Sequence, residues 1–251
     1  MKSRKLQEFI KEIQFANRNP KDNSVLELLD DLSTNPEIVF SKGDFLYRSR
    51  IVEDKRQLNK EKGFYGYGQK DSFVPPLEHT KDMRANYRYI PYLYCANNRY
   101  LSALEVRPRF DAEVSIAKIQ ALGDLVLLDF TMQETPKKML AVKQNLFRDL
   151  SGLFSKPVAK DDDILDYIPT QYIAEYAKNL NYDGIAFGSS LFRFPHNNFY
   201  SYNVVIFQYQ KCKPVLSNVY KVTGYEIDFA QMDADTKQQD LSTPLKRTFE
   251  I

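Results

Sequence analysis

Arginine, glutamate and small polar residues recur beside strand-like segments, and they are the residues of this chain best suited to do chemistry. Arg48 and Arg50 lie in one such segment, Arg84 and Asn86 follow in a loop, and Glu105 comes next. Arginine makes forked contacts with phosphate oxygens. A fixed carboxylate can stabilise positive charge that develops on a sugar when a glycosidic bond breaks. Each residue alone has a plainer interpretation, because exposed strand arginines and surface ion pairs are common.

Several familiar kinds of site are excluded. The chain has neither a Gly-x-Gly-x-x-Gly loop after a strand nor a Walker A loop, so the two standard phosphate cradles are missing. Its two histidines, His79 and His196, lie at no metal-ligand spacing from another His or Cys. We therefore expect no zinc site and no histidine-based nucleophile system. The run Asp161–Asp163 is more typical of a solvated loop than of a cation site, and no bound metal is expected.

Short motifs follow one another in order from residue 45 to about residue 210. They are Tyr47-Arg48-Ser49-Arg50, Met83-Arg84-Ala85-Asn86, Ile90-Pro91-Tyr92-Leu93-Tyr94, Ser102 to Pro108, Asp166 to Gln171, Asp183-Gly184-Ile185, Ser189-Ser190 and Asn203 to Phe207. In this order they resemble the longer form of the RES family, which is named for an Arg, a Glu and a Ser. One motif alone is a weak signal, whereas the whole series is a strong one.

The resemblance implies both a fold and an activity. The expected fold is akin to that of mono-ADP-ribosyltransferase toxins, and the expected substrate is NAD⁺. Members of the family degrade NAD⁺ at its nicotinamide–ribose bond, with phosphate or water as acceptor. Many are toxins paired with a helix-turn-helix antitoxin that plugs the cleft, so such a protein is a possible partner of this chain.

The predicted catalytic residues are Arg48, Arg84 and Glu105. By the resemblance, Arg48 and Arg84, together with Arg50, would clamp the pyrophosphate and the ribose phosphates. Glu105 would stabilise the charge that builds on the ribose and hold the ribose hydroxyls. The plainer alternative pairs Glu105 with Arg107 or Arg109 on the surface. Because nicotinamide is already a cationic leaving group, the scarcity of histidine is no objection.

Four further residues are expected to bind or to support the substrate. Tyr94 would flank the nicotinamide ring. Asn86 would brace the loop that carries Arg84. Ser189 or Ser190 would donate a hydrogen bond to the ribose or to a phosphate, although a Ser-Ser pair alone is merely a turn.

Two other functions stay open. A mono-ADP-ribosyltransferase acting on a host protein would use the same clamp and carboxylate, and would differ only on the acceptor side. The family often has glycines around the Arg-x-Asn segment, where this chain has Met83 before it and Tyr87 to Tyr89 after it. Basic and aromatic residues there could serve a macromolecular acceptor. The third function is an inactive module that binds NAD⁺ or a partner, and the presence of both Arg48 and Glu105 speaks against it.

Short strands and separate helices must position these residues. Strand-like patterns occur near residues 38–40, 45–48, 90–96, 114–116, 124–130, 185–187, 203–208 and 220–227. Apolar residues at helical spacing predict helices over 139–153 and 170–180, while residues 101–106 fit neither pattern. Strands and helices do not alternate regularly. We therefore expect an α+β fold with a core of short, mostly antiparallel strands and helices around it.

Two segments outside that core need their own account. Leu6, Phe9 and Ile13 recur at helical spacing, and a capping box from Ser24 to Glu27 predicts a second short helix before Asn35-Pro36. Residues 53–76 form a long polar loop whose Tyr65 and Tyr67 either tie it down or stack on a flat ligand. The predicted divisions are a helical arm (1–38), an NAD-binding domain (39–230) and a polar tail (231–251).

Composition limits the location and the partners. The 251 residues carry 35 basic and 33 acidic side chains, a net charge of +2, which argues against direct binding of nucleic acid. Charged residues from Glu8 to Glu12 interrupt the apolar stretch that a signal peptide needs, and no segment suits a membrane span. Two cysteines, Cys95 and Cys212, allow at most one disulfide. We expect a cytoplasmic protein without a membrane partner.

Overall fold

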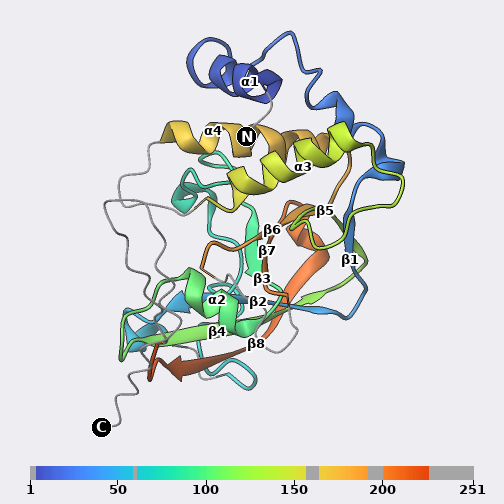
Figure 1. The fold of residues 1–251 in the computed structure, drawn as a ribbon. Coiled ribbons are helices and arrows are strands. Elements are labelled where there is room, and N and C mark those ends of the chain that lie inside the picture. Colours follow the sequence, from blue (N-terminus) through green and yellow to red (C-terminus); the bar gives the residue numbers. More distant parts are fainter. Residues whose placement is uncertain (1–3, 59–60, 157–163, 192–199, 226–251) are drawn as a thin grey trace, which may run out of the picture.

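An eight-stranded sheet organises the chain (Figure 1). The computed structural model describes residues 4–58, 61–156, 164–191 and 200–225. The strand order is β1-β5-β6-β7-β3-β2-β4-β8; β5 and β6 are parallel, and the other described neighbours are antiparallel. The strands are β1 (Glu37–Phe40), β2 (Phe45–Ile51), β3 (Leu93–Ala96), β4 (Glu113–Ala121), β5 (Leu125–Phe130), β6 (Gly184–Gly188), β7 (Tyr202–Ile206) and β8 (Cys212–Lys221).

The α-helices of the described residues lie on two parts of this sheet. Helices α3 (Ala141–Phe154) and α4 (Ile164–Asn179) connect the parallel neighbours β5 and β6, and α1 (Arg4–Phe15) lies outside them, against α4 (Figure 1). Helix α2 (Arg99–Glu105) contacts β2 in the other half. The expected α+β organisation, with a mostly antiparallel sheet and an N-terminal helix, is confirmed.

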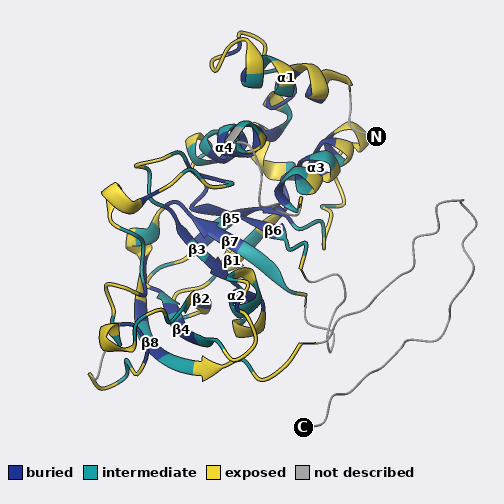
Figure 2. Cartoon of the chain, turned by 90° about the vertical axis from the view of Figure 1, so that its left-hand side faces the viewer, coloured by how far each residue is buried: buried dark blue, intermediate teal, exposed yellow. Residues whose placement is uncertain are grey.

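Two apolar cores form because successive side chains of a strand point to opposite faces of the sheet. In β7, Val205 belongs to the core beneath α1, α3 and α4, whereas Val204 and Ile206 belong to the core on the other face. Figure 2 shows the buried residues concentrated along the strands at the centre of the sheet. Gly184 permits the close pairing of β6 with β7, because a Cβ there would lie 2.3 Å from the carbonyl oxygen of Val205.

The N-terminal arm is helical only in its first part. Leu6, Phe9 and Ile13 are buried against α4, as the spacing predicted. The second predicted helix is wrong, because Glu27–Leu29 and Leu32–Thr34 form single 3₁₀ turns. Three polar contacts tie this part to the helices instead: Tyr172 Oη to Asn23, Tyr176 Oη to Asp30, and Lys143 Nζ to the Asp31 carbonyl. The predicted domain boundaries remain predictions.

A proline inside α4 adds a further link to the arm. Pro169 has no N–H, so the carbonyl of Leu165 lacks the donor that a regular helix would supply four residues later. The side-chain amide of Gln14 in α1 donates to this carbonyl at 2.8 Å. Helix α4 therefore begins six residues before the predicted Thr170 and tolerates the proline near its start.

The pairing of β2 with β3 is the shortest strand pairing in the described sheet. These strands share one register pair, Tyr47 with Ala96, whereas β2 pairs with β4 along seven residues, from Phe45 to Ile51. The two halves of the sheet therefore part beside this single pair. The guanidinium of Arg48 spans the gap and donates to the carbonyl of Tyr94 at 3.1 Å.

The long loop after β2 packs on the sheet. Tyr65 N–H donates to the Ser217 carbonyl of β8 at 2.8 Å, and Tyr67 N–H donates to Ser115 Oγ of β4 at 2.9 Å. A Cβ at Gly66 would lie 2.2 Å from Ser115 Oγ, so this close approach requires glycine. Tyr67 is buried and ties the loop down, which is the plainer of its two predicted roles.

Other outcomes concern single segments. Residues 101–106, which fitted no pattern, lie mostly in α2, where Asn98 caps the helix by accepting from the N–H of Leu101. The last described strand covers Cys212–Lys221 and not the predicted 220–227.

Cys95 and Cys212 are buried free thiols. No helix among the described residues has the length and apolar character to traverse a bilayer. The predicted tail (231–251) lies outside the described residues.

Candidate active site

A cavity of about 630 Å³ opens where the two halves of the sheet part. Its size falls within the range of roughly 300–1,000 Å³ that is usual for small-molecule sites. The residues that line it are Tyr47, Arg48, Ser49, Arg50, Asp82, Met83, Arg84, Tyr94, Cys95, Ala96, Ser102, Glu105, Val106, Arg107, Phe154, Ser155, Lys156, Tyr167, Phe187, Gly188, Ser189, Ser190 and Asn203. Every predicted site residue except Asn86 is among them, although these residues are spread over some 140 positions of the sequence.

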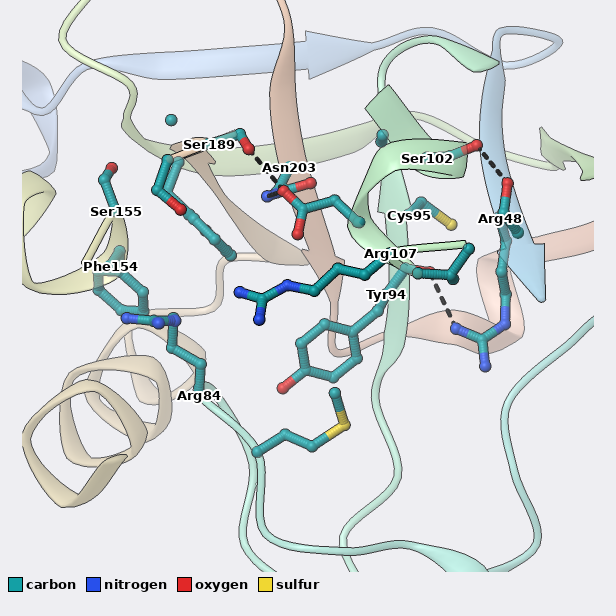
Figure 3. A pocket seen from close by; sticks show the side chains of 18 of the residues that line it. Arg48, Arg84, Tyr94, Cys95, Ser102, Arg107, Phe154, Ser155, Ser189 and Asn203 are labelled. Atoms are coloured by element: carbon teal, nitrogen blue, oxygen red, sulfur yellow. Dashed lines mark hydrogen bonds between the residues drawn. The ribbon is translucent and has the colours of Figure 1, made fainter. Parts of the chain in front are cut away.

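Glu105 lies at the C-terminal end of α2, on one wall of the cavity. Its Oε1 atom accepts two hydrogen bonds of 2.6 Å, from Ser189 Oγ and from Asn203 Nδ2 (Figure 3). These donors come from the ends of β6 and β7, so three separate elements fix the orientation of the carboxylate. Glu105 itself is exposed to solvent, and a ligand in the cavity can reach it. The partners of Oε1 are therefore Ser189 and Asn203, and not Arg107 or Arg109 as in the plainer alternative.

The short helix that presents Glu105 is anchored at its buried side. Ser102 Oγ and Ser49 Oγ lie 2.7 Å apart and join α2 to β2. At the start of the helix, Asn98 Nδ2 donates to Ser201 Oγ at 2.8 Å, which joins α2 to the segment before β7. The position of Glu105 is therefore set by both halves of the sheet.

Arg48 is half-buried in the wall of the cavity. Its Nε atom is buried and has no hydrogen-bond partner among the described residues, while one terminal nitrogen donates to the Tyr94 carbonyl. Burial lowers the pKa of the guanidinium. A buried donor without a partner is costly.

Arg50 and Arg84 both line the cavity, but they have different hydrogen-bond partners. Arg50 is exposed at the rim, donates to the Asp71 carbonyl at 2.7 Å and stacks over the ring of Tyr67. Arg84 donates to the carbonyls of Leu153 and Lys156 at 2.8 and 2.6 Å. These carbonyls lie at the C-terminal end of α3, where a cation is favourably placed. Arg84 thus supports that end of the helix besides lining the cavity.

Asn86 and Tyr94 form one hydrogen-bonded unit, in which Asn86 is buried and Tyr94 is half-buried. Tyr94 Oη donates to Asn86 Oδ1 at 2.8 Å and accepts from the N–H of Ala85 at 3.1 Å. Asn86 Nδ2 donates to the carbonyls of Lys81 and Tyr87, both at 3.0 Å. Asn86 therefore bonds to the loop that carries Arg84 and lies outside the main cavity. Burial raises the pKa of the Tyr94 hydroxyl, so Tyr94 is a neutral wall of the site.

Two cavity residues have roles that the sequence analysis did not assign. Arg107 follows α2 with a positive φ of 46°, and its side chain extends into the cavity between Tyr94 and Asn203 (Figure 3). Asn203 is the second donor to Glu105. Both stood within the ordered motifs, but only the fold shows which side of the turn or strand they face. Ser190 lines the cavity next to Ser189.

No cluster of three or more His, Cys, Asp or Glu side chains able to hold a metal ion occurs in the described part of the chain. His79 lies at a smaller neighbouring cavity. His196 and Asp161–Asp163 lie outside the described residues. The charged side chains that line the cavity are therefore those of four arginines, Lys156, Glu105 and Asp82, and the other lining side chains are neutral.

Comparison with known proteins identifies the family. The RES domain model matches residues 61–229, about two thirds of the chain. No curated protein gives a match. Among solved structures, the chain is similar to the M. tuberculosis MbcT-MbcA toxin-antitoxin complex, with a TM-score of 0.43 and 13% identity over 80% of this chain and 93% of that chain. From the extent of the family match, this chain belongs to the RES domain family.

Proposed function

We propose that the chain binds NAD⁺ in the main cavity and cleaves its nicotinamide–ribose bond, with phosphate or water as acceptor. The observation that carries the proposal is the Glu105 carboxylate, which Ser189 and Asn203 hold in a cavity that is also lined by arginines. The family match and the size of the cavity support the same activity.

The chain's own residues supply binding and charge stabilisation. Arg48, Arg84 and Arg107 offer guanidinium groups suited to the phosphate oxygens of the substrate. Departure of nicotinamide builds positive charge on the ribose, and a carboxylate held in one orientation stabilises that charge without having to reorganise. The donors on Glu105 Oε1 leave Oε2 for the ribose or its hydroxyls. Tyr94, kept neutral by burial, supplies a flat aromatic wall.

The test is nicotinamide release from NAD⁺ by the purified protein, with and without phosphate. Release that disappears in Glu105→Gln supports the proposal, and the phosphate dependence names the acceptor. Absence of release from the wild-type chain under both conditions contradicts it. A glutamine keeps the shape of the side chain and can still accept at its oxygen, so the comparison isolates the charge.

The same material tests the alternatives. A mono-ADP-ribosyltransferase would transfer label from NAD⁺ to a protein of a lysate, whereas cleavage leaves the label in small molecules. An inactive module would bind NAD⁺ and release no nicotinamide. A protein antitoxin that covers the cavity belongs to the proposal as a partner, and it would have to block NAD⁺ binding when added in equal amount.

A further inference from the structure

The segment that carries Arg84 has no regular secondary structure of its own. Residues 80–92 form neither a helix nor a strand, and yet Arg84 has a defined place in the wall of the main cavity. The segment must therefore be held by contacts with other elements. Buried main-chain groups need hydrogen-bond partners, so the partners of its carbonyls show which elements hold it.

Helix α4 holds the segment on both sides of Arg84. The side-chain amide of Gln171 donates to the carbonyl of Met83, just before Arg84, and to the carbonyl of Asn86, just after it, both at 2.9 Å. The N–H of Met83 donates to the same Asn86 carbonyl at 3.0 Å. The two ends of this short stretch are therefore tied to each other and to α4.

Gln171 acts on the cavity only through this segment. Its side chain is 1% exposed, and it lines neither the main cavity nor the smaller one beside it. A glutamine amide has two N–H groups, and here each has a carbonyl to bond. An ionised glutamate would offer no donor, and a methionine would fill the space without one. The two contacts therefore depend on the amide itself.

The side chains of the segment extend the attachment to two further elements. The guanidinium of Arg84 donates to the carbonyls of Leu153 and Lys156 at the end of α3. The N–H of Ala85 donates to Tyr94 Oη of β3 at 3.1 Å. Arg84 and Tyr94 both line the main cavity (Figure 3). Arg84 is thus placed relative to three elements, and Gln171 supplies the contact of its main chain with α4.

We propose that Gln171 is a positioning residue, which holds Arg84 where its guanidinium can contact the phosphate oxygens of NAD⁺. The part in the reaction rests on the proposed function, whereas the attachment of the segment to α4 does not. Asn86 bonds to carbonyls of its own segment, those of Lys81 and Tyr87. Gln171 belongs to another element, so it fixes the segment relative to the rest of the fold.

Hydrogen exchange of the full chain, followed by NMR at the amides of Met83 and Ala85, tests the attachment without NAD⁺. In Gln171→Met we expect both amides to exchange at least about tenfold faster than in the wild type, because the segment opens more often. Gln144→Met is the matched control, because Gln144 also donates to a main-chain carbonyl, that of Met139, and lines neither cavity. Equal exchange in Gln171→Met and the wild type overturns the attachment.

Steady-state kinetics with NAD⁺ test the positioning role. A contact made equally in the ground state and the transition state changes KM and not kcat, so Gln171→Met should raise KM about tenfold and leave kcat within about twofold. Gln144→Met should match the wild type. A merely structural role would reduce the folded fraction, which lowers the apparent kcat and leaves KM unchanged. An unchanged KM in Gln171→Met therefore overturns the positioning role.

A double-mutant cycle shows whether Gln171 acts through Arg84. In an Arg84→Gln background, Gln171→Met should leave KM unchanged, because the side chain that Gln171 positions is already absent. A rise in KM of equal size in both backgrounds overturns the role.

Two outcomes have to be kept apart from these. If Gln171→Met does not fold, Gln171→Asn takes its place in all three measurements with the same expectations, because its amide is one methylene short of the carbonyls. Absence of nicotinamide release from the wild type overturns the proposed function instead. The exchange measurement then decides by itself whether Gln171 holds the segment.

Discussion

The two walls of the main cavity are built differently. On the carboxylate wall (Glu105, Ser189 and Asn203), the side chains bond to one another and remain partly exposed. On the arginine wall (Arg48, Arg84 and Tyr94), each side chain bonds to a main-chain group of another segment, such as the carbonyls at the end of α3. Asn86, outside the main cavity, supports this wall by accepting from Tyr94 Oη. Changes to the first wall should therefore alter chemistry with little effect on stability. Changes to the second should alter both.

The largest effect is expected from Glu105→Gln. Removing one preorganised electrostatic group lowers kcat by about 10²–10³-fold. The carboxylate is exposed, so the melting temperature should stay that of the wild type. Nicotinamide release and thermal unfolding followed by circular dichroism measure the two quantities. Glu53→Gln, at an exposed glutamate outside the cavity, is the control and should match the wild type in both.

Arg107→Gln should weaken substrate binding next most strongly. A hydrogen bond to a charged group contributes about 1.5–3 kcal/mol, so the KM for NAD⁺ should rise by at least about tenfold. Arg109→Gln is the matched control, because Arg109 is exposed two residues further on and does not line the cavity. Steady-state kinetics decide the matter, and equal KM values for the two variants would remove Arg107 from the binding surface.

Asn86→Ala tests the arginine wall. It leaves the Tyr94 hydroxyl and the carbonyls of Lys81 and Tyr87 without their partner in a buried place, which costs about 1–3 kcal/mol of unfolding free energy. Urea unfolding measures the loss, and the KM for NAD⁺ should rise with it because the loop carries Arg84. If the variant lost activity at full stability, Asn86 would be a contact residue and not a brace.

The smallest effect is expected from Tyr94→Phe, at about 1 kcal/mol, because the aromatic ring is retained. It also has a pH signature. Burial raises the pKa of this hydroxyl in the folded chain, so its contribution to stability is present below the unfolded value of about 10 and is lost as the pH rises beyond it. The stability of the variant should therefore fall less steeply above pH 10 than that of the wild type. Parallel curves from urea unfolding would contradict this.

The sequence predicted many of the residues that line the candidate site, but few of the contacts that hold them in place. The ordered motifs named residues that the fold brings to one cavity, although Glu105 and Ser189 are 84 positions apart. The difference in burial between Arg48 and Arg50 was not predictable, because residues two apart on one strand face the same side of the sheet and the strand pattern does not distinguish them. Arg107 points into the cavity because its φ is positive where the chain leaves α2. A positive φ is uncommon for residues other than glycine, so it could not be predicted for an arginine.

The helices and strands also differ in how well the sequence predicted them. Helix α3 and strands β5 and β6 were predicted because their apolar patterns are regular. Strand β8 was missed over most of its length, since Pro214 and the fully buried Ser217 break the apolar alternation. The helix predicted from the capping box at Ser24 does not form. Tyrosines of α4 instead donate hydrogen bonds to the side chains of Asn23 and Asp30. Such contacts are invisible to local patterns.

The link between Gln14 and Leu165 has a consequence for the synthesis of the chain. These residues are 151 positions apart, so at roughly 5–20 residues per second the ribosome needs about 8–30 s to synthesise the segment that binds α1 after α1 itself. During that interval the apolar face of Leu6, Phe9 and Ile13 has no α4 to cover it. The nascent chain therefore passes through a period in which its first helix is a target for chaperones, and the core that α1 shares with α4 closes only after α4 has been made.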